Sequence, residues 1–173
     1  VVGTSAVPAT AQGCVVRAIA DPRPPQLARS CLCPAAPSDV SVYKILLFVS
    51  SEGLTGRKDC GAQGVKDTVS DERVRGIRIF DATDMHNPKY LANVQTWRGS
   101  HTHTVVHDPK DSKNVYIYVS GSSSVRSAKE LPGCLDGPID DPNSVRFRIE
   151  VIRVPLDHPE NAKIVSSPRI FSD

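Results

Sequence analysis

The chain has 173 residues, of which 21 are basic and 19 acidic, giving a net charge of +2. This length allows one domain with a hydrophobic core of its own. Both signs of charge are mixed along the chain without a basic block, which argues against nucleic acid or an anionic membrane as a partner, and no apolar run approaches the roughly 18 residues that a membrane span requires.

Eight short segments of β type follow one another between turns of Asp, Asn and Pro. They are rich in Val, Ile, Tyr and Phe, which favour strands, and "GIRIFD" and "RFRIEVIRV" alternate apolar and charged residues as half-buried strands do. No stretch has a convincing helical period, although 65–76 could form one or two turns in a long loop. We therefore predict an all-β fold, with strands at 39–43, 44–51, 75–82, 90–96, 101–106, 114–121, 146–154 and 162–167.

The order of strands and turns repeats along the chain. The segment "IRIFDATDMHNPKYL" (77–91) aligns with "VIRVPLDHPENAKIV" (151–165), and "LLFVSSE" (46–52) aligns with "YIYVSGS" (116–122). Four strands per unit is the plan of a propeller blade, here with a long loop inside each unit (52–75 and 122–145). We predict a single domain over 1–173 with units at about 14–33, 39–97 and 100–171, which is two and a half blades. The alternative is that recurring turn residues imitate a repeat.

Several longer strings strengthen this interpretation. "DVSVYKILLFVSSE", "RGSHTHTVVHDPKDSKNVYIYVSG" and "GIRIFDATDMHNPKYLANVQ" resemble the LVIVD-repeat proteins, a family of exported bacterial β-propellers. The resemblance implies a propeller and an exported location but no agreed activity. Trp97 stands where the resemblance leads us to expect a cysteine. A propeller closes with at least about four blades, so we expect additional blades or a protein partner, or else units packed as a small β-sandwich.

The cysteines also favour a secreted, periplasmic or cell-surface protein. No C-x-x-C pair of a zinc module occurs, and disulfides are favoured over free thiols in such a chain. Cys60 and Cys134 lie in corresponding long loops, and we predict that they pair, with a stabilisation of roughly 4 kcal/mol in the chain-entropy model. The alternative is that either one pairs with another cysteine; the five are Cys14, Cys31, Cys33, Cys60 and Cys134.

Three histidines fall within seven positions in "GSHTHTVVHDPKD" (99–111). In a strand, His101 and His103 share one face about 7 Å apart, a spacing from which both can reach one Zn²⁺ or Cu²⁺ ion. Asp39 and Glu52 are the candidates for further ligands, because Asp39 occupies in its unit the place of His103 in the next. The alternative is that these residues are hydrogen-bonded structural groups of an innermost strand.

Two functions follow from these patterns. The first is a non-enzymatic binding or structural module, a segment of an exported LVIVD-type propeller that presents long loops to partners. The second is a metal-binding protein or metal-dependent enzyme that uses His101 and His103 with a divalent ion, by analogy with other propellers. No GxSxG, HExxH or Gly-rich phosphate loop is present.

Overall fold

The computed structural model of the chain describes residues 5–6, 9–10, 13–18, 26–33, 39–85 and 87–170. Over these residues the fold is all-β, with one short 3-10 helix, η1 (Pro159–Asn161). No helix in the described part of the chain is both long and apolar enough to cross a membrane. The predicted all-β class is therefore confirmed.

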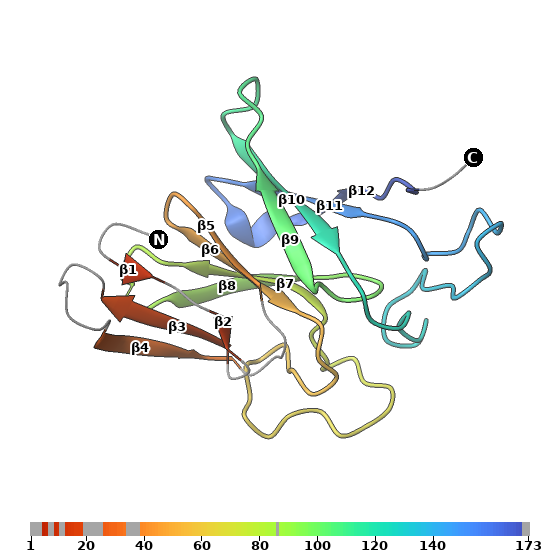
Figure 1. Cartoon of the computed structure of the whole chain (residues 1–173), viewed down its shortest axis with the longest axis horizontal. Helices are drawn as coiled ribbons and strands as arrows, with labels where there is room; N and C mark the ends of the chain where they lie inside the picture. The colour runs from red at the N-terminus through yellow and green to blue at the C-terminus, as the bar shows by residue number, and fades with distance from the viewer. Residues whose placement is uncertain are drawn as a thin grey trace.

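Eight strands form two sheets of the same design (Figure 1). In each sheet every strand pairs antiparallel with the strand that follows it in the chain, so each sheet is a four-stranded meander. The middle sheet contains β5 (Val40–Tyr43), β6 (Leu46–Ser51), β7 (Gly76–Asp81) and β8 (Lys89–Gln95). The last sheet contains β9 (Thr102–Val106), β10 (Asn114–Ser120), β11 (Glu150–Pro155) and β12 (Lys163–Ser166).

These strands coincide with the eight predicted segments to within a few residues, with one larger difference. β11 begins at Glu150, four residues later than predicted, because Phe147 has a backbone φ of 58°. A left-handed residue of this kind does not fit the extended backbone of a strand.

A first sheet precedes these two in the chain. It contains β1 (Ser5–Ala6), β2 (Ala9–Thr10), β3 (Gly13–Ala18) and β4 (Gln26–Leu32), and β3 pairs with each of the other three. The β3–β4 register sets Cys14 opposite Cys31. The predicted unit 14–33 thus corresponds to β3 and β4, while its residues 19–25 lie outside the described residues.

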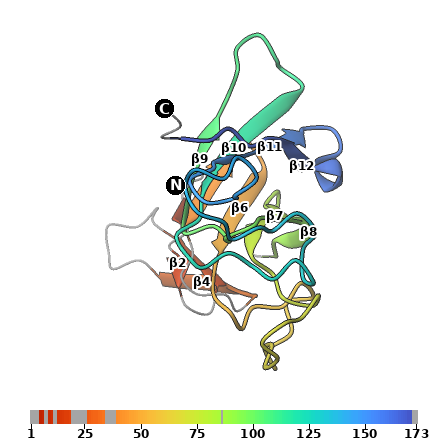
Figure 2. The ribbon, with the colours of Figure 1, turned by 90° about the vertical axis from the view of Figure 1, so that its right-hand side faces the viewer.

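The middle sheet lies between the other two (Figures 1 and 2). Every residue of β6 is buried, as expected only for a strand covered on both faces. On the face toward the last sheet, the side chains of the middle sheet share one apolar core with that sheet. This core is formed by Leu46, Phe48, Ile77, Ile79, Val94, Val115, Ile117, Val119, Ile152 and Val154. On its other face a second core contains Cys33, Leu47, Val49, Phe80 and Ala82.

Burial on both faces corrects the interpretation of "GIRIFD" as a half-buried strand. Arg78 in the centre of β7 is fully buried, so this charged position of the alternation does not face water. Its guanidinium donates hydrogen bonds to the carbonyl oxygens of Cys33, at 3.0 Å, and Arg57, at 2.9 Å. These carbonyl acceptors replace the hydrogen bonds to water that the guanidinium loses on burial.

The last sheet, in contrast, has an uncovered outer face among the described residues. Tyr118, Val106 and Val165 are 42%, 37% and 44% exposed on it. Tyr118 is registered opposite Thr104 of β9 and Val151 of β11, so it lies at the centre of that face.

The predicted disulfide between Cys60 and Cys134 is wrong. Cys60 pairs with Cys33, with 4.4 Å between their Cα atoms, and Cys134 is a buried free thiol. Cys60 packs on the core between the first and middle sheets, whereas Cys134 lies in the loop before β11, near Arg126 and Glu150. Corresponding loops therefore carry the two thiols to different sites, and the alternative pairing with Cys33 holds.

Candidate functional site

The first strands of the middle and last sheets, β5 and β9, are in contact, and the histidine cluster lies there. The His103 Nδ1 atom is 2.7 Å from Ser50 Oγ, which is also 2.7 Å from Ser100 Oγ. The His103 backbone N–H donates to Asp39 Oδ2 at 3.0 Å, so His103 of β9 is tied to residues around β5 and β6. The cluster fastens the two sheets together at their first strands.

The direction of these hydrogen bonds fixes the tautomer of His103. Ser100 Oγ–H donates to the Thr102 carbonyl at 3.2 Å, a group that can only accept. Ser50 therefore donates to Ser100 and accepts from a protonated His103 Nδ1, which leaves a lone pair on Nε2. That Nε2 atom is buried without a hydrogen-bond partner among the described residues. Burial lowers the pKa of His103, with the Asp39 charge acting in the opposite direction.

His101 and Glu52 form a separate pair. His101 is half exposed, and its Nδ1 lies 3.2 Å from Glu52 Oε2. Glu52 is already occupied, because its carboxylate accepts the backbone N–H groups of Ser122, at 2.6 Å, and Ser123, at 2.9 Å. Burial alone would raise the pKa of Glu52, but these donors and the side chains of Ser122 and His101 outweigh it and lower the pKa.

The four predicted metal ligands are thus gathered as two pairs, His103 with Asp39 and His101 with Glu52. In the described part of the chain no three His, Cys, Asp or Glu side chains converge so as to hold a metal ion. Nor does the cluster form a nucleophile–base relay. Ser50 is fully buried, and both Ser50 Oγ and Asp39 face the same imidazole nitrogen, Nδ1, whereas a relay uses both nitrogens.

A buried polar network joins the two long loops, and sequence reasoning missed it. These loops are residues 52–75 between β6 and β7 and residues 121–149 between β10 and β11; we call them together the loop rim. Glu130 is the centre of the network: it forms ion pairs with Arg73 and with Arg126, whose Nε is 3.0 Å away, and it accepts the Ser70 N–H at 2.9 Å.

Arginines extend this network to the ends of the sheets. Arg126 Nη1 donates to Gln95 Oε1 of β8 at 2.6 Å, and Arg75 Nη2 donates to the carbonyls of Arg98, at 3.0 Å, and Ser124, at 2.8 Å. The only sequence signal for these contacts was the Arg and Glu content of "SDERVRG" and "SSSVRSAKE", which is equally typical of solvated loops.

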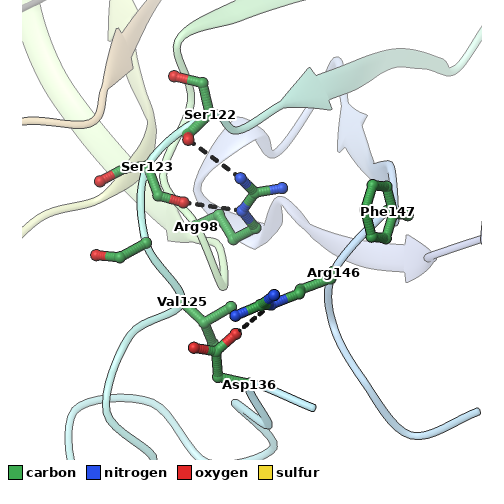
Figure 3. Close-up of a pocket in the computed structure, with 8 residues that line it drawn as sticks. Arg98, Ser122, Ser123, Val125, Asp136, Arg146 and Phe147 are labelled. Atoms are coloured by element: carbon green, nitrogen blue, oxygen red, sulfur yellow. Dashed lines mark hydrogen bonds and ion pairs between the residues drawn. The ribbon is translucent and has the colours of Figure 1, made fainter. Parts of the chain in front are cut away.

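Beside the network the loop rim contains a cavity of about 320 Å³ (Figure 3). Arg98 and Arg146 both line it, together with the ring of Phe147 and the serine run 122–124. Arg98 comes from the β8–β9 connection, whereas the other residues come from the second long loop. The cavity therefore forms only when the last strand of the middle sheet and the loop of the last sheet lie together.

One further buried carboxyl lies under the rim. Glu150 at the start of β11 is only 3% exposed, and its Oε1 accepts the Trp97 N–H at 2.7 Å. Burial raises the pKa of Glu150 to about 7, although the Trp97 N–H and the charges of Arg98 and Arg126 act against it.

Comparison of the chain with protein-family models, with curated proteins and with solved structures finds no match.

Proposed function

We propose that this chain is a non-enzymatic binding module, a segment of an exported LVIVD-type β-propeller whose loop rim faces its partners. The observation that carries the proposal is that two meander sheets pack face to face. Their first strands are in contact, and the Glu130 network joins their long loops. Consecutive blades of a propeller have this relation to one another.

The burial of the middle sheet favours blades over the small β-sandwich. Each sheet of a two-layer sandwich keeps one face toward water, but β6 is buried along its whole length. A stack in which sheets follow one another is the arrangement of a ring segment.

A ring segment needs a further sheet on its free side, and the outer face of the last sheet supports this. Tyr118 and Val165 are exposed there, whereas the residues aligned with them in the middle sheet, Phe48 and Leu91, lie in the core that this sheet shares with the last sheet. We propose that another four-stranded sheet of the same kind covers this face. With this chain alone in solution, the source of that sheet is a second copy.

The disulfide supports the exported location. The buried Cys33 and the partly buried Cys60 form a bridge, and disulfides persist in oxidising compartments. A secreted, periplasmic or cell-surface protein is therefore part of the proposal.

Light scattering tests this proposal. We expect the wild-type chain to show a mass above the 18.7 kDa of a single copy at about 100 µM, a concentration at which weak interfaces are populated. Tyr118→Arg places a charge at the centre of the open face and should return the mass to that of one copy.

The matched control is Ser112→Arg, which adds the same charge at an exposed turn before β10 and should leave the mass unchanged. A single-copy mass for the wild-type chain, or equal masses for Tyr118→Arg and Ser112→Arg, would contradict the proposal.

A further inference from the structure

The cavity of the loop rim has walls that are held in place before any ligand arrives. Arg98 Nε donates to the Ser123 carbonyl at 2.8 Å and its Nη2 donates to the Ser122 carbonyl at 3.1 Å. From the other side, Glu52 accepts the N–H groups of the same two serines. The serine backbone is thus fixed by one arginine and one carboxylate, and a preorganised wall reduces the entropy lost on binding.

Close backbone packing adds to this rigidity. A Cβ atom at Gly121 would lie 2.6 Å from the Gly99 carbonyl oxygen and 2.9 Å from Arg98 Cβ, so only glycine allows the serine run to approach the β8–β9 connection. Gly99 has a φ of +80° and packs against Glu52. Both glycines serve the cavity wall that carries Arg98.

Phe147 contributes an apolar wall. It is 37% exposed and has a left-handed backbone, a conformation that is costly for an aromatic residue. The Ile170 N–H donates to its carbonyl at 2.7 Å, which fixes this strained turn. Non-glycine residues in such conformations gather at functional sites, and here the strain holds an aromatic ring beside two guanidinium groups (Figure 3).

The guanidinium groups retain free donors. Two nitrogens of Arg98 are used by the serine carbonyls, which leaves its Nη1 without a protein partner among the described residues. Within the described part of the chain, the Arg146 guanidinium donates only through Nε, to Asp136 Oδ1. The donors left over can bind an anion, because arginine presents its N–H groups in the geometry that a carboxylate accepts.

The charge of the cavity indicates which anion fits. Two guanidinium groups, from Arg98 and Arg146, and one carboxylate, from Asp136, line it, and their charges sum to +1. A monoanion neutralises this charge, whereas a phosphate dianion would leave an excess negative charge close to Asp136. A volume of about 320 Å³ lies at the lower end of the roughly 300–1,000 Å³ of small-molecule sites.

We propose that this cavity binds a carboxylate that is joined to an apolar or aromatic group, with Arg98 and Arg146 on the carboxylate and Phe147 against the apolar part. The carboxylate belongs either to a small organic acid or to the C-terminus of a peptide that ends in an apolar residue. This inference rests on the proposed binding role of the loop rim, but not on association between copies.

Titration of the labelled protein with benzoate, followed by amide NMR shifts, tests the proposal. We expect saturable shifts at Ser122, Ser123 and Phe147, and weaker or no shifts with benzamide, the neutral isostere. Phosphate should bind more weakly than benzoate.

Two substitutions should change the affinity for benzoate in opposite directions, a result that loss of folding cannot produce. Arg146→Gln should weaken benzoate binding about tenfold, as expected for loss of a charged hydrogen bond, and Asp136→Asn should strengthen it because Arg146 is released. Lys129→Gln removes a charge from the same loop at an exposed site outside the cavity and should bind as the wild type.

Two peptides distinguish the sources of the carboxylate. Acetyl-Ala-Ala-Phe with a free C-terminus should bind more tightly than benzoate if peptide ends are the natural ligand, and less tightly if small acids are; its amidated form should not bind in either case. Equal shifts with benzoate and benzamide, or unchanged binding in Arg146→Gln and Asp136→Asn, would overturn the proposal. If the chain associates in light scattering but does not bind benzoate, only the proposed carboxylate site is contradicted. If it binds benzoate but stays a single copy, only the proposed ring segment is contradicted.

Discussion

Glu52 and Glu150 are both buried carboxylates, but their pKa values move in opposite directions because different numbers of donors oppose the effect of burial. Glu52 accepts two backbone N–H groups and the Ser122 hydroxyl, and its pKa is lowered in spite of burial. Among the described residues, the Glu150 side chain accepts a hydrogen bond only from the Trp97 N–H, so burial dominates and raises its pKa to about 7. One residue type is thus a charged hydrogen-bond acceptor at one position and, below about pH 7, a neutral acid at the other.

Glu150→Gln tests the second of these roles. A pKa of about 7 in the folded chain exceeds the ordinary 4.5, so the stability that Glu150 contributes is present below pH 4.5 and is lost as the pH rises through 7. The loss amounts to at most about 3 kcal/mol. Glutamine keeps the acceptor for Trp97 and cannot ionise, so urea unfolding of this variant should show no such loss between pH 5 and pH 8.

The control for this prediction is Glu160→Gln, a substitution of an exposed carboxylate that should retain the wild-type pH dependence. If Glu150→Gln and the wild type lose the same free energy of unfolding over that range, Glu150 is not the group responsible.

At the scale of elements, strand existence could be predicted from the sequence, and contacts between loops could not. All eight predicted strands have counterparts because Val, Ile and Tyr runs and Asp/Pro turns are local signals. The Cys60 partner depends on which face of the middle sheet the first long loop covers, and the Glu130 network depends on two loops meeting in space. Neither property is encoded locally. The histidine cluster was found from its spacing, but its role as a pair of hydrogen-bonded clamps required the partners Ser50 and Ser122.

The Cys33–Cys60 bridge gives a prediction at this scale. The two residues are 27 apart in the sequence, and replacing both by serine should lower the free energy of unfolding by about 3 to 4 kcal/mol in the chain-entropy model. Non-reducing peptide mapping should recover Cys33 and Cys60 in one linked fragment and Cys134 as a free thiol. Recovery of Cys60 linked to Cys134 would instead restore the pairing first predicted from the sequence.

For the whole molecule, burial decides how the sheets are assembled. The strand patterns alone allow a sandwich or a stack of blades, because both alternate apolar and polar residues. Full burial of β6 and of Arg78 in β7 requires cover on two faces, which the sequence pattern "GIRIFD" did not indicate. The loop rim is a property of the same scale, since Arg98 of one unit and Arg146 of the next meet only in the assembled fold.

The central claim is that the two long loops form one ordered surface rather than two solvated connections. Hydrogen exchange of backbone amides tests it most directly, at Ser70, Ser122 and Arg126, whose N–H groups donate to Glu130, Glu52 and the Trp97 carbonyl. We expect these amides to be protected almost as strongly as those of β10, and Glu130→Gln to remove protection from both loops together while the strands keep theirs. Exchange of the wild-type loop amides at the rate of an unfolded chain would contradict the account.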